Sequence, residues 1–284
     1  RATSLSPQAL LSEIRALRDL NRRTAYFNVV TPILMQIYDS LLRKRLSKLG
    51  ISLEDVNLRR DAPELEELDP TPVIHALKMA YDELSPGIQA KLQKEKARAF
   101  AEPASNGPEM EAFATAFDRF LQRFGHLSDS GNDFSSPRWR ETPNLLLDLI
   151  MTHPDTANQK DTRPRFGELD LPILKRRRLR NLKEKTLRYQ VYRERIGSLY
   201  TYGQGLFRTY FLALGQAMVE RGQIEMAEDI FYLIWDEIAD WVENPSEQTI
   251  NGISLYELVG NRRDEVEASR DLELPEIIYG DAVP

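Results

Sequence analysis

Polar side chains that could bind a ligand gather in one short segment of the chain, residues 124–141. The segment reads FGHLSDSGNDFSSPRWRE and holds a histidine, two aspartates, four serines and a tryptophan between two arginines. Glycine permits positive φ, and Asp, Asn and Ser side chains bond back to the backbone. The segment therefore predicts an ordered, turn-rich loop. A long irregular loop inside a helical body usually binds something or joins two subdomains.

Six polar residues of this loop are the candidate binding surface. Together they have more donors and acceptors than a simple turn uses, so we expect some of them to face a ligand or a neighbouring domain. We expect Trp139 to anchor the loop in the helical body, while Arg138 and Arg140 keep their charged ends exposed. The alternative is that the polar groups bond one another and only hold the loop's shape. The six residues are His126, Ser128, Asp129, Ser130, Asn132 and Asp133.

A second candidate surface lies further along the chain, where Arg193 and Arg208 stand among five tyrosines within residues 189–210. Rigid aromatic rings with hydroxyl tips suit the wall of a pocket for a large, partly polar ligand. The same tyrosines could instead pack between helices with their hydroxyls in water. The basic run KRRR at 175–178 is either a solvated helix face or a surface for an acidic partner.

Composition and motifs exclude several classes of protein. The 284 residues carry a net charge of -6, which argues against nucleic-acid binding, and no run of 18 apolar residues predicts a membrane span. No catalytic residue and no metal site are predicted, because the chain has no Cys and only three scattered His. We expect a cytoplasmic protein. Since the chain starts without Met, we also expect it to be a piece of a longer one.

The helices that must position these residues are indicated by apolar side chains at three-to-four spacing, which predicts an all-α, multi-helix fold. Residues 155–168 are predicted to be poorly ordered, and the long helix of about 171–220 is either continuous or broken near Gly203. We divide the chain into an N-terminal helical subdomain at 1–102, a central one at 103–272 with the loop 124–141, and a linker at 273–284. The predicted helices span about 8–20, 24–49, 71–84, 85–101, 109–124, 143–152, 171–220, 226–244 and 254–269, with Pro32 kinking or dividing the second.

Several short motifs resemble those of phosphoenolpyruvate-utilising phosphotransferases, a superfamily that includes phosphoenolpyruvate synthase-like proteins and rifampicin phosphotransferase. The matching pieces lie in order over roughly residues 110–280. They are FLQRFGH at 120–126, SDSGNDFS at 128–135, PRWRE at 137–141, YRER at 192–195, EDIFYLIWDEI at 228–238 and LPEIIYG at 274–280. The loop reads GHLSDSGND at 125–133, where the commoner family form is GHRGPGE.D.

The resemblance implies the central helical region of an ATP-dependent phosphotransferase. Such enzymes also contain an ATP-grasp domain and a small domain with a phosphorylated His, and this chain shows neither the Gly-rich nucleotide loop nor the Ser-His segment. The resemblance therefore implies a small-molecule acceptor bound here, ATP and Mg²⁺ bound by the full-length enzyme rather than by this chain, and flanking domains of the same polypeptide as partners. Because the loop departs from the common form, rifampicin is not implied as the acceptor. The alternative is a non-catalytic helical interaction or ligand-binding module.

Overall fold

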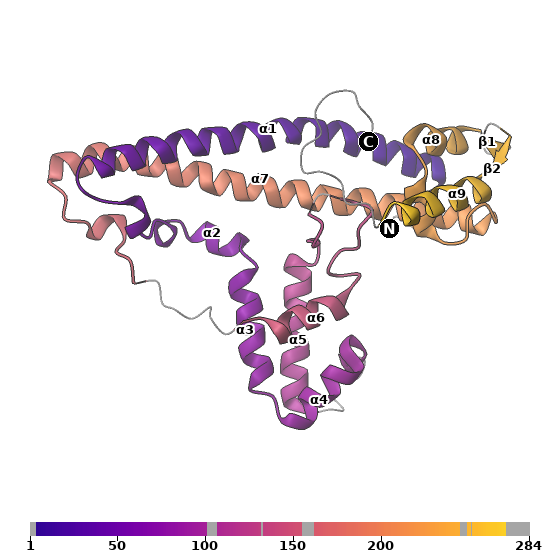
Figure 1. The fold of residues 1–284 in the computed structure, drawn as a ribbon, viewed down its shortest axis with the longest axis horizontal. Helices are drawn as coiled ribbons and strands as arrows, with labels where there is room; N and C mark the ends of the chain where they lie inside the picture. The colour runs from indigo at the N-terminus through magenta and orange to yellow at the C-terminus, as the bar shows by residue number, and fades with distance from the viewer. Residues whose placement is uncertain are drawn as a thin grey trace. The chain divides into compact units, whose positions relative to one another are not determined.

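The computed structural model describes residues 4–100, 107–131, 133–154, 162–244, 249–250 and 252–270. Their regular secondary structure is helical, apart from a hairpin of two short antiparallel strands, β1 (Thr249–Ile250) and β2 (Ile253–Ser254) (Figure 1). The predicted all-α class is confirmed. The three-to-four spacing of apolar residues gives each helix one face to bury, and the chain offers few runs that alternate in polarity as strands do.

Contacts divide the chain into two compact units. The terminal unit consists of Arg1–Ala16 and Phe207–Pro284, and the central unit of Leu17–Leu206. Helices α1 (Pro7–Ser47) and α7 (Ile173–Glu220) contribute to both units. The domain boundaries predicted at residues 102 and 272 were placed where the helical pattern of the sequence breaks. The two compact units instead divide inside α1 and α7. The predicted linker at 273–284 lies outside the described residues.

The two long helices of the central unit run antiparallel, side by side (Figure 1). The ring of Tyr38 on α1 stacks on that of Tyr189 on α7, with centroids 5.1 Å apart. The helices predicted at 8–20 and 24–49 are one continuous helix, because residues 21–23 hold no helix breaker and Pro32 lies inside α1 without ending it. Helix α7 is also continuous, so Gly203 does not break it.

One core of the central unit joins the C-terminal part of α1 to α7. Leu42 and Leu46 pack there with Leu179 and Leu187. Short helical turns between them close this core: η2 (Leu53–Asp55), η3 (Arg59–Asp61), α2 (Pro63–Leu68) and η7 (Phe166–Glu168). Phe166 is only 3% exposed in this core, so its part of the segment predicted to be poorly ordered is anchored, and that prediction is wrong there. Residues 155–161 of the same prediction lie outside the described residues.

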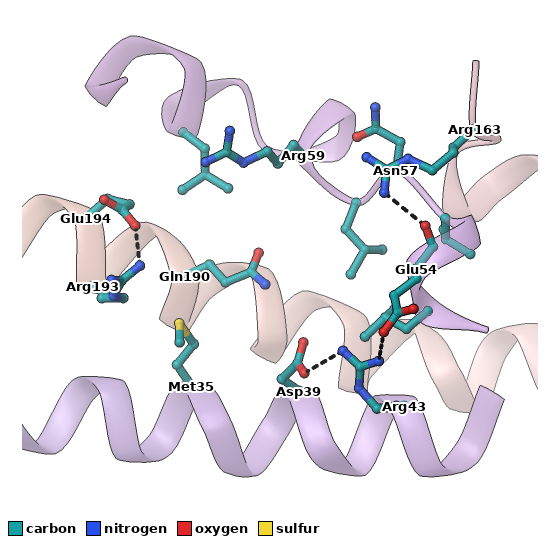
Figure 2. A pocket seen from close by; sticks show the side chains of 14 residues that line it. Met35, Asp39, Arg43, Glu54, Asn57, Arg59, Arg163, Gln190, Arg193 and Glu194 are labelled. Atoms are coloured by element: carbon teal, nitrogen blue, oxygen red, sulfur yellow. Dashed lines mark hydrogen bonds and ion pairs between the residues drawn. The ribbon is translucent and has the colours of Figure 1, made fainter. Parts of the chain in front are cut away.

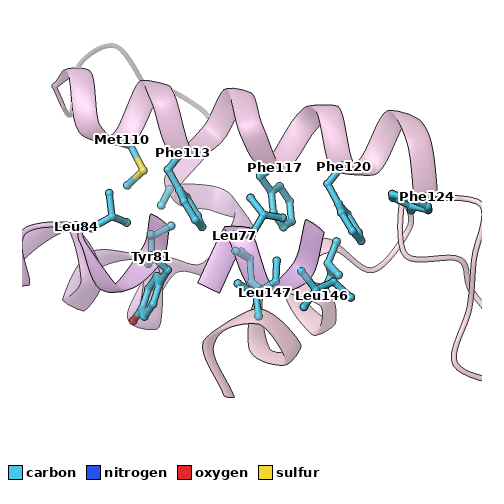
Figure 3. Packing of buried hydrophobic residues seen from close by; sticks show 14 residues of the cluster. Leu77, Tyr81, Leu84, Met110, Phe113, Phe117, Phe120, Phe124, Leu146 and Leu147 are labelled. Atoms are coloured by element: carbon cyan, nitrogen blue, oxygen red, sulfur yellow. The ribbon is translucent and has the colours of Figure 1, made fainter. Parts of the chain in front are cut away.

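A second core of the central unit is rich in phenylalanine and carries the loop. It is formed by α3 (Thr71–Asp82), α4 (Pro86–Glu95), η4 (Lys96–Phe100), α5 (Pro108–Phe124) and α6 (Pro143–Thr152). Figure 3 shows four phenylalanines of α5 pointing from one face toward Leu77, Leu146 and Leu147: Phe113, Phe117, Phe120 and Phe124. Their spacing of three or four residues is that of a single helix face. The loop 125–142 connects α5 to α6 and is therefore fixed at both ends by this core.

The terminal unit packs the end of α7 with η8 (Ala227–Tyr232), α8 (Trp235–Glu243) and α9 (Leu255–Ala268). The helix predicted at 226–244 is therefore two elements, separated at residues 233–234. The division is set by capping, because the Glu237 carboxylate accepts the N–H of Ile234 at 2.9 Å and starts α8. Two guanidinium N–H groups of Arg262 on α9 also bind the carboxylate of Glu237, at 2.7 and 2.8 Å. None of the helices in the described part of the chain combines the length and apolar character needed to cross a bilayer.

Candidate functional site: the loop between helices α5 and α6

Backbone hydrogen bonds fold the candidate loop back on itself. The N–H of Trp139 donates to the carbonyl of Leu127 at 2.9 Å, and the N–H of Arg140 donates to the carbonyl of Gly125 at 3.1 Å. The two strands of the loop approach so closely at Gly125 that a Cβ there would lie 3.1 Å from the Cβ of Arg140. Gly131, at the tip, has a φ of 66°, which is the left-handed conformation that glycine adopts without strain.

Trp139 anchors the loop, as predicted. Its ring stacks on Phe120 of α5 with centroids 5.8 Å apart, and it packs against the phenylalanine-rich core. Its Nε1–H donates to the Asp129 carboxylate at 2.9 Å, so the indole holds the far side of the loop as well. The side chain is half-buried rather than fully buried.

Arg138 is buried, which corrects the expectation that its charged end is exposed. Only 3% of the residue is accessible. Its guanidinium donates to the Ser128 hydroxyl at 2.9 Å and to the carbonyls of Gly131 and Asp133 at 3.1 and 3.2 Å. These acceptors converge only in the folded loop, so a rule based on residue type could not reveal them. Arg140, by contrast, is exposed as predicted.

The carboxylate of Asp133 accepts hydrogen bonds from the two serines that follow it in the chain, Ser135 and Ser136. It accepts the N–H and hydroxyl of Ser135, at 2.9 and 2.7 Å, and the hydroxyl of Ser136 at 2.8 Å. Burial, the largest single influence, favours the protonated acid, but the hydrogen bonds from Ser135 and Ser136 together outweigh it and lower the pKa of Asp133. The hydroxyls of Ser128 and Ser130 lie 3.1 Å apart. Asn132 lies outside the described residues.

His126 differs from the other candidates because part of its bonding capacity is unused. Its Nε2 is buried and has no hydrogen-bond partner among the described residues. The ring meets Tyr202 of α7 edge-on, with centroids 5.8 Å apart. Burial lowers the pKa of His126, and the nearby charges of Arg140 and Arg138 lower it further, against a hydrogen bond to the Arg123 backbone that raises it. The ring is therefore neutral at pH 7.

The remaining two candidates lie on α7. Arg208 belongs to the terminal unit, where it is buried and lies over the ring of Phe231 at 5.3 Å. Arg193 lines a separate pocket of about 380 Å³ in the central unit. Of the predicted site residues, the structure therefore describes five on the loop, all but Asn132, and it describes Arg193 at a separate pocket.

The pocket beside Arg193 is built from α1, the turns at residues 53–59, α2, Arg163 and α7 (Figure 2). Its polar wall consists of arginine and carboxylate side chains that form ion pairs with each other. Arg43 binds Asp39 and Glu54 at 3.6 and 2.9 Å, and Arg193 binds Glu194 at 2.8 Å. The sequence analysis missed this pocket because its walls come from positions more than 100 residues apart, and no local motif signals such a meeting.

Metal binding has no structural support in the described residues. No three His, Asp or Glu side chains there lie close enough together to hold an ion.

Fold and loop together define an all-helical region that carries an ordered polar loop between two helices of a phenylalanine-rich core. Residues 67–194 of this region match a family model described as the rifampicin phosphotransferase fourth domain. The match covers the loop, the helices on both sides of it and the first part of α7, and it confirms the resemblance to phosphoenolpyruvate-utilising phosphotransferases over these residues. The region is therefore phosphotransferase-related.

Proposed function

We propose that this chain is the acceptor-binding region of a phosphoenolpyruvate synthase-like, ATP-dependent phosphotransferase. The family match and the anchored loop support this proposal. Flanking ATP-grasp and phosphohistidine domains of the same polypeptide would supply the phosphoryl group, and those domains would hold ATP and Mg²⁺. The chain would bind the small molecule whose hydroxyl accepts the phosphoryl group. Without the flanking domains it would be catalytically incomplete.

The observation that carries the proposal is the unused Nε2 of His126. In a neutral imidazole one nitrogen donates and the other accepts, so Nε2 is available as an acceptor when the other nitrogen carries the proton. A buried acceptor atom without a partner is costly unless a ligand or water supplies a donor. A hydroxyl of the acceptor molecule is a donor of the required kind. Ser128, Asp129 and Asp133 bond within the loop, and they would position His126 rather than touch the ligand.

The test begins with the coding sequence, which should encode ATP-grasp and phosphohistidine segments beside this region. In that polypeptide, phosphoryl transfer from [γ-³²P]ATP to a panel of hydroxyl compounds identifies the acceptor. His126→Phe keeps a ring against Tyr202 but removes the nitrogen. We expect it to raise KM for the acceptor about tenfold or more, as the loss of one hydrogen bond predicts, while ATP still phosphorylates the shuttle His at the wild-type rate.

The matched control is His75→Phe, which changes a histidine of α3 whose two ring nitrogens are also buried without a partner among the described residues. This variant should keep the wild-type KM. If both variants, or neither, change KM for the acceptor while circular dichroism shows them folded, His126 is not the binding residue. A coding sequence without either flanking segment would contradict the proposed function itself.

A second candidate function is a non-catalytic interaction module. It is favoured by one observation, the row of exposed apolar side chains on α1, which includes Tyr26, Ile33 and Ile37. Large exposed apolar patches mark interaction sites more often than catalytic ones. The two functions do not exclude each other, because α1 and the loop are different surfaces.

A further inference from the structure

The middle of α1 has the composition of a buried helix. Residues 24–42 contain a single charged side chain, Asp39. A helix that is apolar on most of its faces normally lies inside a protein or an assembly. One face of this segment does so, since Tyr38 and Leu42 pack toward α7.

Another face of the same segment is exposed. Tyr26, Ile33, Ile37 and Leu41 expose 64, 55, 48 and 42% of their surface. With the half-buried Val30 they recur every three or four residues, which places them on one side of the helix. We call these five residues the α1 stripe. A continuous apolar stripe of this length on a protein surface indicates an interaction site.

Positive charges bound the α1 stripe at both ends. Arg22 and Lys44 lie eleven residues before and after Ile33, about three helical turns away, and therefore on the same face. Arg23 and Lys48 reinforce the two ends. All four are exposed, and none forms an ion pair with a described residue. The cationic ends are roughly 33 Å apart at 1.5 Å per residue.

We propose that the α1 stripe docks one amphipathic helix of a partner protein. The partner helix carries an apolar stripe of its own and acidic residues at both ends, about 22 residues apart, to face Arg22 and Lys44. This is helix-on-helix recognition in which the apolar centre supplies affinity and the charged ends fix the register.

Charge placement distinguishes this partner from a second copy of the chain and from a lipid surface. A second α1 would set Arg22 against Lys44 when antiparallel and against another Arg22 when parallel, and both arrangements oppose like charges. A helix that lies on a membrane carries cations along the edges of its apolar face. Residues 24–42 carry none, and the cations stand only at the ends.

The probe is a fluorescein-labelled helical peptide of about 26 residues with leucines at three-to-four spacing and paired glutamates at both ends. The control peptide has the same composition with its glutamates moved to the middle of the polar face. Fluorescence anisotropy measures the binding of each to the 284-residue chain. We expect the first peptide to bind at least about tenfold more tightly than the control.

Two variants locate the site. The pair Ile33→Glu and Ile37→Glu, both at exposed positions, should weaken binding at least about tenfold while circular dichroism shows an unchanged fold. Reversing the four end charges to Glu should abolish the preference for the glutamate-ended peptide. The same charge-reversed chain should instead prefer a peptide with lysines at its ends, which a merely destabilised chain would not do.

Four results would overturn the proposal. The first is equal binding of both peptides to the wild-type chain. The second is binding that survives the Ile33→Glu and Ile37→Glu pair. The third is a dimer in sedimentation velocity that this pair dissociates, which would make a second copy the occupant. The fourth is co-sedimentation with phosphatidylcholine vesicles containing about 30% phosphatidylserine that the same pair abolishes, which would make a lipid surface the occupant.

Discussion

His126 and Arg138 lie on the same loop, where Arg138 and the Nε2 atom of His126 are buried, with different consequences. Arg138 stays charged because a hydroxyl and two carbonyls receive its N–H groups. His126 has a lowered pKa because its burial has no comparable compensation. The loop therefore stabilises the charged guanidinium of Arg138, and it disfavours the protonated form of the neighbouring His126. This leaves a neutral imidazole at the surface we assign to the acceptor.

The lowered pKa of His126 predicts a stability change with pH. Above the ordinary His pKa of 6.5 the ring is neutral in both states and contributes no pH dependence. Below it, the unfolded chain binds a proton that the folded chain resists, so the free energy of unfolding falls until the pH passes the lowered pKa. His126→Gln removes this effect. The wild type should therefore lose stability relative to His126→Gln as the pH drops from about 7.5 to 5.

Guanidinium unfolding followed by circular dichroism measures this difference. Other groups with shifted pKa values, such as Asp133 and Glu237, are present in both proteins and cancel in the comparison. A difference that stays constant over this pH range, or that grows in favour of the wild type, would show that the ring is not held neutral by burial.

Trp139→Ala should destabilise the loop and the core beneath it. The indole stacks on Phe120 and binds Asp129, but it is only half-buried. We therefore expect a loss of about 2–3 kcal/mol, below the 3–5 kcal/mol typical of a fully buried tryptophan. Trp139→Phe keeps a ring over Phe120 and loses the hydrogen bond alone, so it should cost about 1 kcal/mol. Urea unfolding of the two variants checks the order, and equal losses would show that the stacking contributes nothing.

The loop contacts also change what is expected of its aspartates. Asn in place of Asp129 or Asp133 would leave folding nearly intact if these carboxylates had no partner within the loop. In the structure Asp129 receives the indole N–H, and Asp133 receives bonds from Ser135 and Ser136. An amide has one acceptor oxygen instead of two, so Asp133→Asn must give up part of this set. Any loss of transfer activity in such a variant therefore has to be separated from a loss of stability.

At the scale of elements, α7 contains glycines with opposite roles. A Cβ on Gly215 would lie 2.1 Å from the carbonyl oxygen of Ala227, so this glycine lets η8 approach the helix, whereas a Cβ on Gly203 would meet nothing within 4 Å. Gly215→Ala should therefore destabilise the terminal unit by about 1–3 kcal/mol or more. Gly203→Ala should stabilise the chain by about 0.5–1 kcal/mol, because alanine favours the helix.

Thermal unfolding of these two single-methyl variants gives the measurement. The comparison is matched, since both residues lie inside the same helix and gain the same group. Melting temperatures that move in the same direction would contradict the close approach of η8 at Gly215.

Element boundaries could be predicted from the sequence where a capping residue and a hydrophobic pattern coincide. The helices at 109–124 and 143–152 were predicted almost to the residue, since each begins beside a proline and ends where its apolar face ends. The predicted break at residues 21–23 was wrong, because these residues contain no helix breaker, and Pro32 lies inside α1 without dividing it. The split between η8 and α8 depends on distant partners such as Arg262, which local patterns do not contain.

At the scale of the whole molecule, the sequence revealed the class of protein better than the location of its surfaces. The motifs in the loop pointed to phosphotransferases, and residues 67–194 match that family. The tyrosine-rich segment 189–210 suggested Arg193 and Arg208 as further site residues, and the structure places Arg193 at a pocket built from α1, α7 and the turns at residues 53–59. Residue type and order along the chain identify a family, whereas proximity depends on how α1 and α7 pack. For the same reason the burial of Arg138 and the pocket beside Arg193 could not be predicted.

The last prediction concerns activity of the chain by itself. Phosphoryl transfer requires groups that hold the nucleotide phosphates and their Mg²⁺, together with a carrier for the phosphoryl group. This sequence offers neither a Gly-rich nucleotide loop nor the Ser-His segment that carries the phosphoryl group in phosphotransferases of this kind. We therefore expect the purified 284-residue chain to turn over neither ATP nor phosphoenolpyruvate in a coupled spectrophotometric assay with Mg²⁺. The His126→Phe chain serves as the control. Robust turnover that this substitution abolishes would make His126 a phosphoryl carrier, and the chain would then be a catalyst instead of the acceptor-binding region of one.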